Sequence, residues 1–445
     1  MKSGLLFSGV GDCEPGGEGI LPSQEIRQFA TTGVICSPRE VTPDQIQPAS
    51  IDLRLWHEAY RVRASFLPGK STTLRHKATA NGLLDREIDI TDPVLLEPGV
   101  VYLIRVMESL ALPHDVHGIA NAKSSTGRLD IHTRLITECG DEFERVPKGY
   151  HGDLYVEVVS RTFPILVQRG MKLNQLRFVR GQSDPAADSA LRNLAEYDLL
   201  VRGDDNRPDQ VHIDRGLRVT VDLQGNGADI VAYQAKNNAP PIDLSRINHY
   251  DKAEFWTPIL KPSKGYLILE GDRFYILASK QRVRVGPRHA AEMVPYDPTT
   301  GEFRAHYAGF FDPGFGYGAG GEIQGTKAVL EVRPHGIPVL LEDDQFVGRL
   351  LYYKMAETPD KIYGVSIGSS YQQQGLALSK QFKVEPQSAP GSTSTSAAAA
   401  KDDTEATPHQ TVAKLRTTET DDDDSILKIA FPDNRGEHGI NAKNH

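Results

Sequence analysis

Short apolar segments separated by glycine, proline and aspartate dominate the first 384 residues of the chain. Examples are Val100–Val106, Leu154–Val159, Tyr275–Ala278 and Val329–Val332, in which β-branched and aromatic residues are frequent. Many short strands with frequent turns are typical of an all-β sandwich or barrel. Helical periodicity is credible only at residues 23–31 and 190–200. The pattern therefore predicts a mainly-β fold with few helices.

The chain repeats itself once. Four landmarks recur at an offset of 174 residues: Pro113 and Pro287, Thr126-Gly127 and Thr300-Gly301, Glu157 and Glu331, and Pro164 and Pro338. An earlier pair, Ser50–Leu53 and Thr220–Leu223, recurs at 170 residues. Self-similarity at a fixed offset indicates a duplication. We therefore predict two copies of one β-rich domain, a first repeat over residues 20–180 and a second repeat over residues 211–384.

The remaining segments are expected to lie outside the two repeats. Residues 1–19 are rich in glycine and predict a flexible N-terminus, and the turn-rich residues 181–210 predict a linker. From residue 385 the composition predicts a disordered acidic tail, because it offers too little apolar surface to offset the ordering entropy. In that tail an apolar group follows four aspartates: Ile426, Leu427, Ile429 and Phe431. This group is either a stray patch or a short peptide that adds a strand to a partner.

Charge and cysteine content narrow the classes of function. The net charge of −9 and the pI of about 5.9 argue against a general nucleic-acid or membrane-surface binder, since such proteins carry a positive field. Cys13, Cys36 and Cys139 are odd in number, far apart and without C-x-x-C spacing, which excludes a disulfide scaffold and a four-ligand zinc site. No apolar run is long enough to span a membrane, and the N-terminus lacks the features of a signal peptide. We therefore expect a soluble protein in a reducing compartment.

The turn Lys123–Arg128 combines two cations with three hydroxyl groups. A guanidinium beside hydroxyl and backbone donors suits a phosphate chain. The alternative is an ordinary polar turn. The second repeat has Asp297–Glu302 at the equivalent place, so the basic turn has become acidic there.

Glu157 and Glu331 each lie inside an apolar strand. Because neighbouring side chains in a strand point to opposite faces, each glutamate lines the face opposite its valine or leucine neighbours. A buried carboxylate tends to have a raised pKa, and such a group can exchange protons near neutral pH. The alternative is a solvated face of an edge strand.

Two further segments carry candidate chemistry. Asp312–Gly316 is a tight turn with a carboxylate, whereas the first repeat has Pro147–Gly152 there and lacks the aspartate. The polar segment 363–375, rich in glycine, glutamine and tyrosine, is either a lid over a ligand or a frayed terminus.

Together these motifs resemble the dCTP deaminase family of the dUTPase-like superfamily, in its long bacterial-type form with a tandem repeat. Ile46–Leu55 looks like the family's early strand motif, and Lys123–Arg128 looks like its basic-Ser-Ser-x-x-Arg motif. Asp312–Gly316 and Gly149–Gly152 both resemble its Asp-Pro-Gly-Trp-x-Gly hairpin. Glu157 and Glu331 stand where the family's glutamate follows that hairpin, and Arg169–Leu176 is similar to a later motif shared with dUTPases.

The resemblance implies a distorted β-barrel or jelly-roll in each repeat and sites built at subunit contacts, hence a homo-oligomer such as a trimer or a multiple of it. It implies an enzyme that hydrolyses dCTP to dUTP and ammonia for dTTP synthesis, with dCTP as its partner and dTTP as a candidate inhibitor on which the sequence itself is silent. From charge, cysteine content and hydropathy we expect a cytoplasmic protein with no nucleic-acid or membrane partner. Mg²⁺ would come with the triphosphate, with no metal ligand on the protein. Zinc is not expected, because the H-x-E and P-C-x-x-C elements of the zinc deaminases are absent from the sequence.

The resemblance also implies roles for individual residues. Glu157 or Glu331 would activate the water that attacks C4 of cytosine, while Ser124 and Arg128 would orient that water and stabilise charge. The nucleotide contacts would be Lys123, Ser124, Ser125, Thr126, Gly127, Arg128, Tyr155, Val156, Asp312, Tyr363 and Gln374.

Spacing alone leaves several alternatives open. The basic turn could meet Glu157 of another chain's first repeat, or it could meet Asp312 and Glu331 of a second repeat; we prefer Glu157. Because Glu302 in the second turn would repel phosphate, we expect one working site per chain. The alternative activities are a dUTP diphosphatase and a bifunctional enzyme that continues to dUMP. A further alternative is that the protein is not an enzyme but a nucleotide-binding module.

Overall fold

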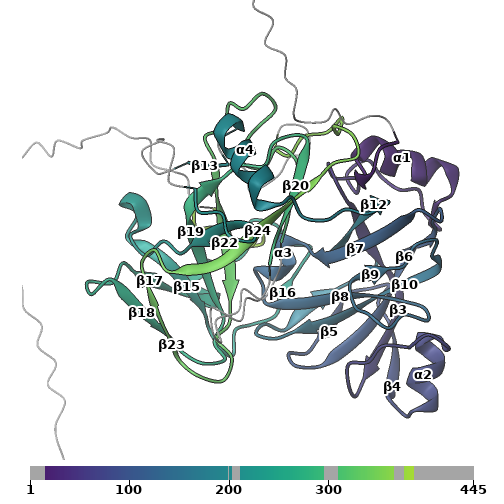
Figure 1. The fold of residues 1–445 in the computed structure, drawn as a ribbon. Helices are drawn as coiled ribbons and strands as arrows, with labels where there is room; N and C mark the ends of the chain where they lie inside the picture. The colour runs from purple at the N-terminus through teal and green to yellow at the C-terminus, as the bar shows by residue number, and fades with distance from the viewer. Residues whose placement is uncertain (1–15, 199, 203–210, 295–308, 365–374, 385–445) are drawn as a thin grey trace, which may run out of the picture. The chain divides into compact units, whose positions relative to one another are not determined.

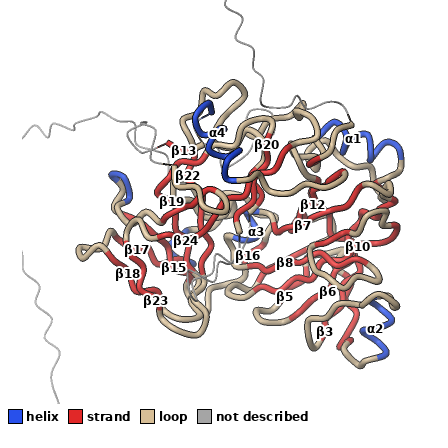
Figure 2. The backbone as a smooth tube through the Cα atoms, in the orientation of Figure 1, coloured by secondary structure: helices blue, strands red, loops and turns tan. Residues whose placement is uncertain are grey.

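The computed structural model describes residues 16–198, 200–202, 211–294, 309–364 and 375–384. Strands form most of the regular structure, and the longer helices lie at the margins of the molecule (Figure 2). The predicted mainly-β fold is therefore confirmed. Among the described residues, no helix is long and apolar enough to cross a membrane.

The first repeat is built on one large sheet. Its elements are β1 (Gly19–Ile20), α1 (Ser23–Thr32), β2 (Ile35–Cys36), β3 (Ile51–Val62), α2 (Leu74–Ala80), β4 (Leu84–Asp89), β5 (Val94–Leu96), β6 (Val101–Ala111), β7 (Val116–Ala122), α3 (Ser124–Gly127), β8 (Ile131–Thr137), β9 (Arg145–Val146), β10 (His151–Ser160), β11 (Ile165–Val167) and β12 (Lys172–Arg180). The strand order of the large sheet is β8-β10-β6-β3-β12-β7-β9, with β1 beside β12, β2 beside β6 and β4 beside β3.

The second repeat is divided among smaller sheets. The elements from the linker onward are α4 (Asp188–Asp198), β13 (Val201–Arg202), β14 (Leu217–Thr220), η1 (Gly225–Gly227), β15 (Ile230–Ala235), β16 (Ile242–Asp243), α5 (Lys252–Phe255), β17 (Trp256–Leu260), β18 (Tyr266–Leu269), β19 (Tyr275–Val283), β20 (His289–Met293), β21 (Phe310–Phe311), β22 (Thr326–Val332), β23 (Val339–Glu342) and β24 (Phe346–Lys354). One sheet has the order β13-β19-β15-β17 with β22 beside β19, and a second has the order β14-β24-β20-β21.

The strands repeat at the spacing that the sequence shows. The first residues of β6 and β19, of β11 and β23, and of β12 and β24 are each 174 positions apart. Equivalent strands therefore begin at equivalent residues in the two repeats. Glu157 on β10 and Glu331 on β22 consequently occupy equivalent places in two different sheets.

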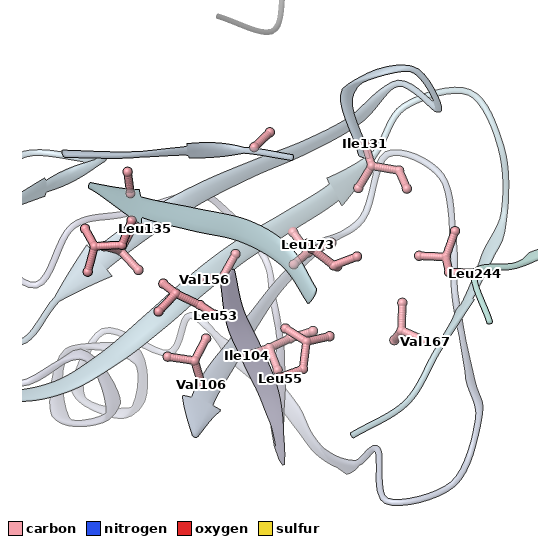
Figure 3. Packing of buried hydrophobic residues seen from close by; sticks show 14 of the residues in the cluster. Leu53, Leu55, Ile104, Val106, Ile131, Leu135, Val156, Val167, Leu173 and Leu244 are labelled. Atoms are coloured by element: carbon pink, nitrogen blue, oxygen red, sulfur yellow. The ribbon is translucent and has the colours of Figure 1, made fainter. Parts of the chain in front are cut away.

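Each repeat has a hydrophobic core, and the first core extends across the boundary between them. Leu53, Ile104, Val156 and Leu173 pack in the first core, and Leu244 of the second repeat lies beside its edge (Figure 3). Strand β16 pairs in parallel with β11, so that Ile242 faces Ile165. The two repeats are therefore joined by backbone hydrogen bonds as well as by apolar contact.

Both predicted helices are present, as α1 and α4. Helix α1 buries Ile26 and Phe29 and ends at Gly33, whose φ of 80° requires a residue that tolerates the left-handed region. The sequence did not predict α2, because seven residues with only Leu74 and Ala78 buried show little helical period.

The segment predicted as a linker does more than connect the repeats. Leu191 on α4, Leu200 and Val201 are buried in the core of the second repeat, and β13 pairs with β19. The prediction of a simple connector over residues 181–210 was therefore too narrow, since apolar side chains between the polar turns find a core to enter. The predicted N-terminal segment through residue 15, most of the predicted lid and the predicted tail lie outside the described residues.

Candidate active site

The basic turn predicted from the sequence is a single helical turn where the two repeats meet (Figure 1). It follows β7 and precedes β8. The backbone N–H of Thr126 donates to the Lys123 carbonyl at 2.8 Å, and that of Arg128 donates to the Ser124 carbonyl at 3.0 Å. These bonds close the turn, and they fix the direction in which Arg128 leaves it.

Arg128 lies beside Glu331 of the second repeat. Its Nε is 3.9 Å from Glu331 Oε1, and both side chains are buried. Burial raises the pKa of the Glu331 carboxyl to about 7, although the Arg128 charge opposes the rise. Arg128 also donates from Nη1 to the carbonyl of Ala377 at 3.1 Å. The structure thus places a carboxyl that titrates near neutral pH beside a fixed cation.

Glu157 has a different partner. It lies on β10 directly opposite Arg134 of β8, and Arg134 donates to Glu157 Oε1 from Nε at 3.0 Å and from Nη2 at 2.5 Å. Both glutamates are buried, at 1% exposure for Glu157 and 7% for Glu331, so the alternative of a solvated edge strand is excluded for both. Within this chain the basic turn meets Glu331, whereas Glu157 is held by its strand neighbour.

The hairpin aspartate is also close to the turn. Asp312 Oδ1 accepts a hydrogen bond from Arg177 Nη2 at 3.2 Å, and burial raises the pKa of Asp312 while Arg177 opposes the rise. The charges of Asp52 and Lys123 act on Asp312 as well. Arg177 is a residue that the sequence analysis missed. It lies on β12, just beyond the predicted motif Arg169–Leu176, and only its contact with the other repeat shows its role.

A cavity of about 430 Å³ borders the turn. Its charged and hydroxyl-bearing lining residues are Lys123, Lys172, Lys380, Asp44, Asp52, Ser125, Thr126 and Ser245. Lys123 pairs with Asp52, and Lys172 pairs with Asp44 at 2.5 Å. Burial lowers the pKa of Lys380, and the Lys123 charge adds to this effect. Three lysines around one cavity form a site suited to an anionic ligand.

The chain returns to the basic turn at its described end. Ser379 donates from Oγ to the Ser125 carbonyl at 2.7 Å, and Phe382 is buried in the first core. Of the two predicted lid contacts, Tyr363 donates its backbone N–H to Pro313 at 2.9 Å, and its ring centroid lies 5.5 Å from that of Phe315. Gln374 lies outside the described residues. The sequence analysis did not single out residues 375–384, which carry a lysine, Lys380, into the cavity.

Models of one family match nearly all of the described chain. The model of the 2'-deoxycytidine 5'-triphosphate deaminase N-terminal domain matches residues 17–182, and that of the C-terminal domain matches residues 187–382. The protein "dCTP deaminase, dUMP-forming" of Acidothermus cellulolyticus is 31% identical over 166 residues, which are 37% of this chain and 81% of that protein. The chain belongs to the dCTP deaminase family.

Two further relatives define the relation of the chain to the family. The protein "dCTP deaminase, dUMP-forming" of Corynebacterium efficiens is 34% identical over 160 residues, covering 35% of this chain and 77% of that protein. A crystal structure of 2'-deoxycytidine 5'-triphosphate deaminase from Agrobacterium tumefaciens is 44% identical, with a TM-score of 0.71, and the match covers 76% of this chain and 99% of that one. The two curated dCTP deaminases thus match a length close to one repeat, whereas the Agrobacterium structure matches a length close to both.

The family resemblance implied Val156 and Tyr155 as nucleotide contacts, but the side chains of both residues are buried in hydrophobic clusters. Val156 is buried in the first core (Figure 3). Tyr155 is buried in a separate cluster with Tyr60 and Leu103. Both directly precede Glu157 on β10.

No set of protein ligands for a metal ion is apparent in the described part of the chain. There, no group of three or more His, Cys, Asp or Glu side chains is placed to hold a metal. The two carboxylates of the cavity, Asp44 and Asp52, are each engaged by a lysine.

Proposed function

We propose that this protein hydrolyses dCTP to dUTP and ammonia at the contact between Arg128 and Glu331. The observation that carries this proposal is a buried glutamate with a pKa of about 7, placed 3.9 Å from an arginine of the basic turn. A general base works best when its pKa is near the working pH, because both of its protonation states are then accessible. The dCTP deaminases that the chain resembles support the same substrate.

The chemistry needs one base that can also return a proton. Ionised Glu331 takes a proton from water as the water oxygen bonds to C4 of cytosine. Protonated Glu331 then passes that proton to the 4-amino nitrogen, the C4–N bond breaks, and ammonia leaves. The remaining proton of the C4 hydroxyl moves to N3, which gives the C4 carbonyl and the N3–H of dUTP. Arg128 contributes a positive charge beside the developing negative charge, and such fixed charges are effective in a buried site. Ser124 would position the water from the same turn.

Glu331 is the better candidate for the base than Glu157. Arg134 forms two hydrogen bonds with Glu157 Oε1, and these bonds hold that carboxyl group in a fixed position. Arg128 stands farther from Glu331 than a hydrogen bond allows, so it leaves room for proton exchange at that carboxyl. We therefore revise the preference for Glu157 in favour of Glu331.

The lysine cavity is the proposed site of the triphosphate. Lys123, Ser125 and Thr126 line it from the basic turn, and Lys172 and Lys380 line it from elsewhere. Before the substrate binds, Asp52 and Asp44 hold the ammonium groups of Lys123 and Lys172 at the cavity. When the triphosphate binds, its oxygens would compete with these two carboxylates for the lysines. Mg²⁺ would enter as part of the substrate, Mg²⁺–dCTP. Asp312, held by Arg177, would contact the sugar.

A second candidate activity is supported by the names of two relatives. The Acidothermus and Corynebacterium proteins are named as dUMP-forming, and both are more than 30% identical to this chain. A bifunctional enzyme would hydrolyse dUTP to dUMP and pyrophosphate in the same site. Product analysis separates the two activities, since the simple deaminase stops at dUTP.

The decisive experiment incubates the full chain with Mg²⁺–dCTP and separates the products by chromatography. Glu331→Gln is expected to lower kcat by about 10²–10⁴-fold. Glu157→Gln is the matched control, because it changes the equivalent residue of the other repeat, and it should retain activity. Full activity in Glu331→Gln would exclude this residue as the base. Absence of dUTP and dUMP with the unmodified chain would exclude both activities and favour a nucleotide-binding module.

Three finer predictions accompany the proposal. We expect the protein to form a homo-oligomer, to be inhibited by dTTP in competition with dCTP, and to reside in the cytoplasm. Light scattering of the full chain, dTTP titration at several dCTP concentrations and cell fractionation test them in turn.

A further inference from the structure

A second ion pair lies directly beside the contact of Arg128 with Glu331. Arg333 pairs with Asp130 through Nη2 and Oδ2, and these residues are 7% and 0% exposed. Thr162 joins the pair, since its Oγ1 donates to Asp130 at 2.6 Å and accepts from Arg333 at 2.8 Å. Asp130 holds its place with a φ of 58°, in the left-handed region that non-glycine residues rarely adopt. The surroundings therefore determine this conformation strongly.

The two pairs have opposite charge order. In the first repeat Arg128 is followed two positions later by Asp130, and in the second repeat Glu331 is followed two positions later by Arg333. Arg128 thus faces Glu331, and Asp130 faces Arg333. Each position of one segment meets the opposite charge on the other segment. Sliding either segment by two residues would bring like charges together.

The duplicated sequence shows what the other combinations would contain. At the offset of 174 residues, the second repeat has Glu302 and Arg304 in place of Arg128 and Asp130. That turn against its own strand would oppose Glu302 to Glu331 and Arg304 to Arg333. The first repeat has Val159 two positions after Glu157, so its strand offers no cation to Asp130. The first turn with the second strand is the only one of these combinations in which both positions attract.

We propose that Asp130 and Arg333 are positioning residues that hold Arg128 at Glu331, and that their charges restrict the active site to the turn of the first repeat with the strand of the second. The proposal rests on the proposed function, and it adds a reason for a single site per chain. Buried ion pairs have their best-attested use in specifying register. Specificity of this kind needs repulsion in the wrong combination as well as attraction in the right one.

A double-mutant cycle on the full chain tests the proposal. Asp130→Asn and Arg333→Gln are each expected to lower kcat by about 10²-fold, because a small displacement of Arg128 removes its charge from the reacting atoms. The KM for Mg²⁺–dCTP should change much less. The double variant should be no slower than either single variant, since the second change removes nothing that remains. Independent effects that multiply in the double variant would overturn the proposal.

The pH profile adds a readout that a merely structural role would not move. If Arg128 drifts from Glu331, the glutamate loses a neighbouring cation, and the acidic limb of kcat/KM should move to higher pH. If a single variant does not fold, the double variant alone tests the proposal. In the double variant a neutral amide replaces each of the two charged groups, so no charged group is left buried without a partner. Wild-type kcat and an unmoved limb in the folded double variant would overturn the proposal.

Two controls keep this test separate from that of the proposed function. Glu108→Gln breaks another buried pair, with Arg54 at 2.8 Å, inside the first repeat. It should lower the melting temperature and leave the acidic limb in place. One outcome separates the two proposals: Glu331→Gln is inactive, while Asp130→Asn and Arg333→Gln keep the wild-type kcat and the wild-type position of the acidic limb of kcat/KM. The positioning proposal then fails, and the proposed function stands. If Glu331→Gln is fully active, the proposed function itself fails.

Discussion

Arg128 Nε lies 3.9 Å from Glu331 Oε1, although the two residues are 203 positions apart in the chain. The arginine comes from a turn after β7, and the glutamate comes from the middle of β22. The contact therefore joins a turn of the first repeat to a strand of the second repeat.

The first prediction concerns the pH dependence of activity. Glu331 must be ionised to accept a proton from water, and its pKa is about 7. The value of kcat/KM should therefore rise with pH and level off above about pH 7, since it reports ionisations of the free enzyme. Steady-state rates between pH 5 and pH 9 measure this limb. A limb near the ordinary glutamate pKa of about 4.3 would contradict the assignment.

The second prediction concerns stability at different pH values. Burial raises the folded-state pKa of Glu331 from 4.5 to about 7, so its protonated form is favoured in the folded chain. The stability linked to this group is complete below pH 4.5 and is lost as pH rises through 7. Because one pKa unit corresponds to about 1.4 kcal/mol, Glu331→Gln should gain up to about 3 kcal/mol relative to wild type between pH 5 and pH 8. Urea unfolding at both values measures the difference, and an equal effect at both would contradict it.

The third prediction concerns the pair of Arg177 with Asp312. Arg177→Met leaves Asp312 buried without its cation, and removal of one partner from a buried pair costs about 3–5 kcal/mol. Arg177→Met combined with Asp312→Asn should recover much of this loss. Arg27→Gln is the control, because its pair with Asp360 is half exposed, and such pairs contribute about 0–1 kcal/mol. Denaturant unfolding of the wild type and these three variants measures the effects. Equal losses for Arg177→Met and Arg27→Gln would refute the argument.

The fourth prediction concerns the lysine cavity. Lys172→Gln and Lys380→Gln should each raise the KM for Mg²⁺–dCTP by about 10-fold, as expected for the loss of one charge-assisted hydrogen bond of roughly 1.5 kcal/mol. The kcat should change less, because the base and Arg128 remain in place. Lys70→Gln is the matched control, since Lys70 is exposed and pairs with Asp141, outside the lining of the cavity. A KM that does not move in either cavity variant would place the triphosphate elsewhere.

The sequence was sufficient for the architecture and for most of the candidate residues. Alternation of apolar and polar residues and the distribution of turn residues are local properties, so they predicted a mainly-β chain. The landmarks at 174 positions predicted a repeat that the strands of both halves follow. The motif at residues 123–128 and the two strand glutamates were found because their residue types are unusual in those settings.

Only the tertiary structure decided which of these residues meet. Periodicity placed Glu157 and Glu331 on equivalent strands, and it could not distinguish them. Their difference comes from Arg134, which faces Glu157 across one sheet, and from Arg128, which reaches Glu331 from the other repeat. Contacts of this kind depend on how two sheets dock, and residues some 200 positions apart leave no local pattern. For the same reason Arg177 and the pair of Asp130 with Arg333 became visible only in the folded chain, where burial and opposite charge bring them together.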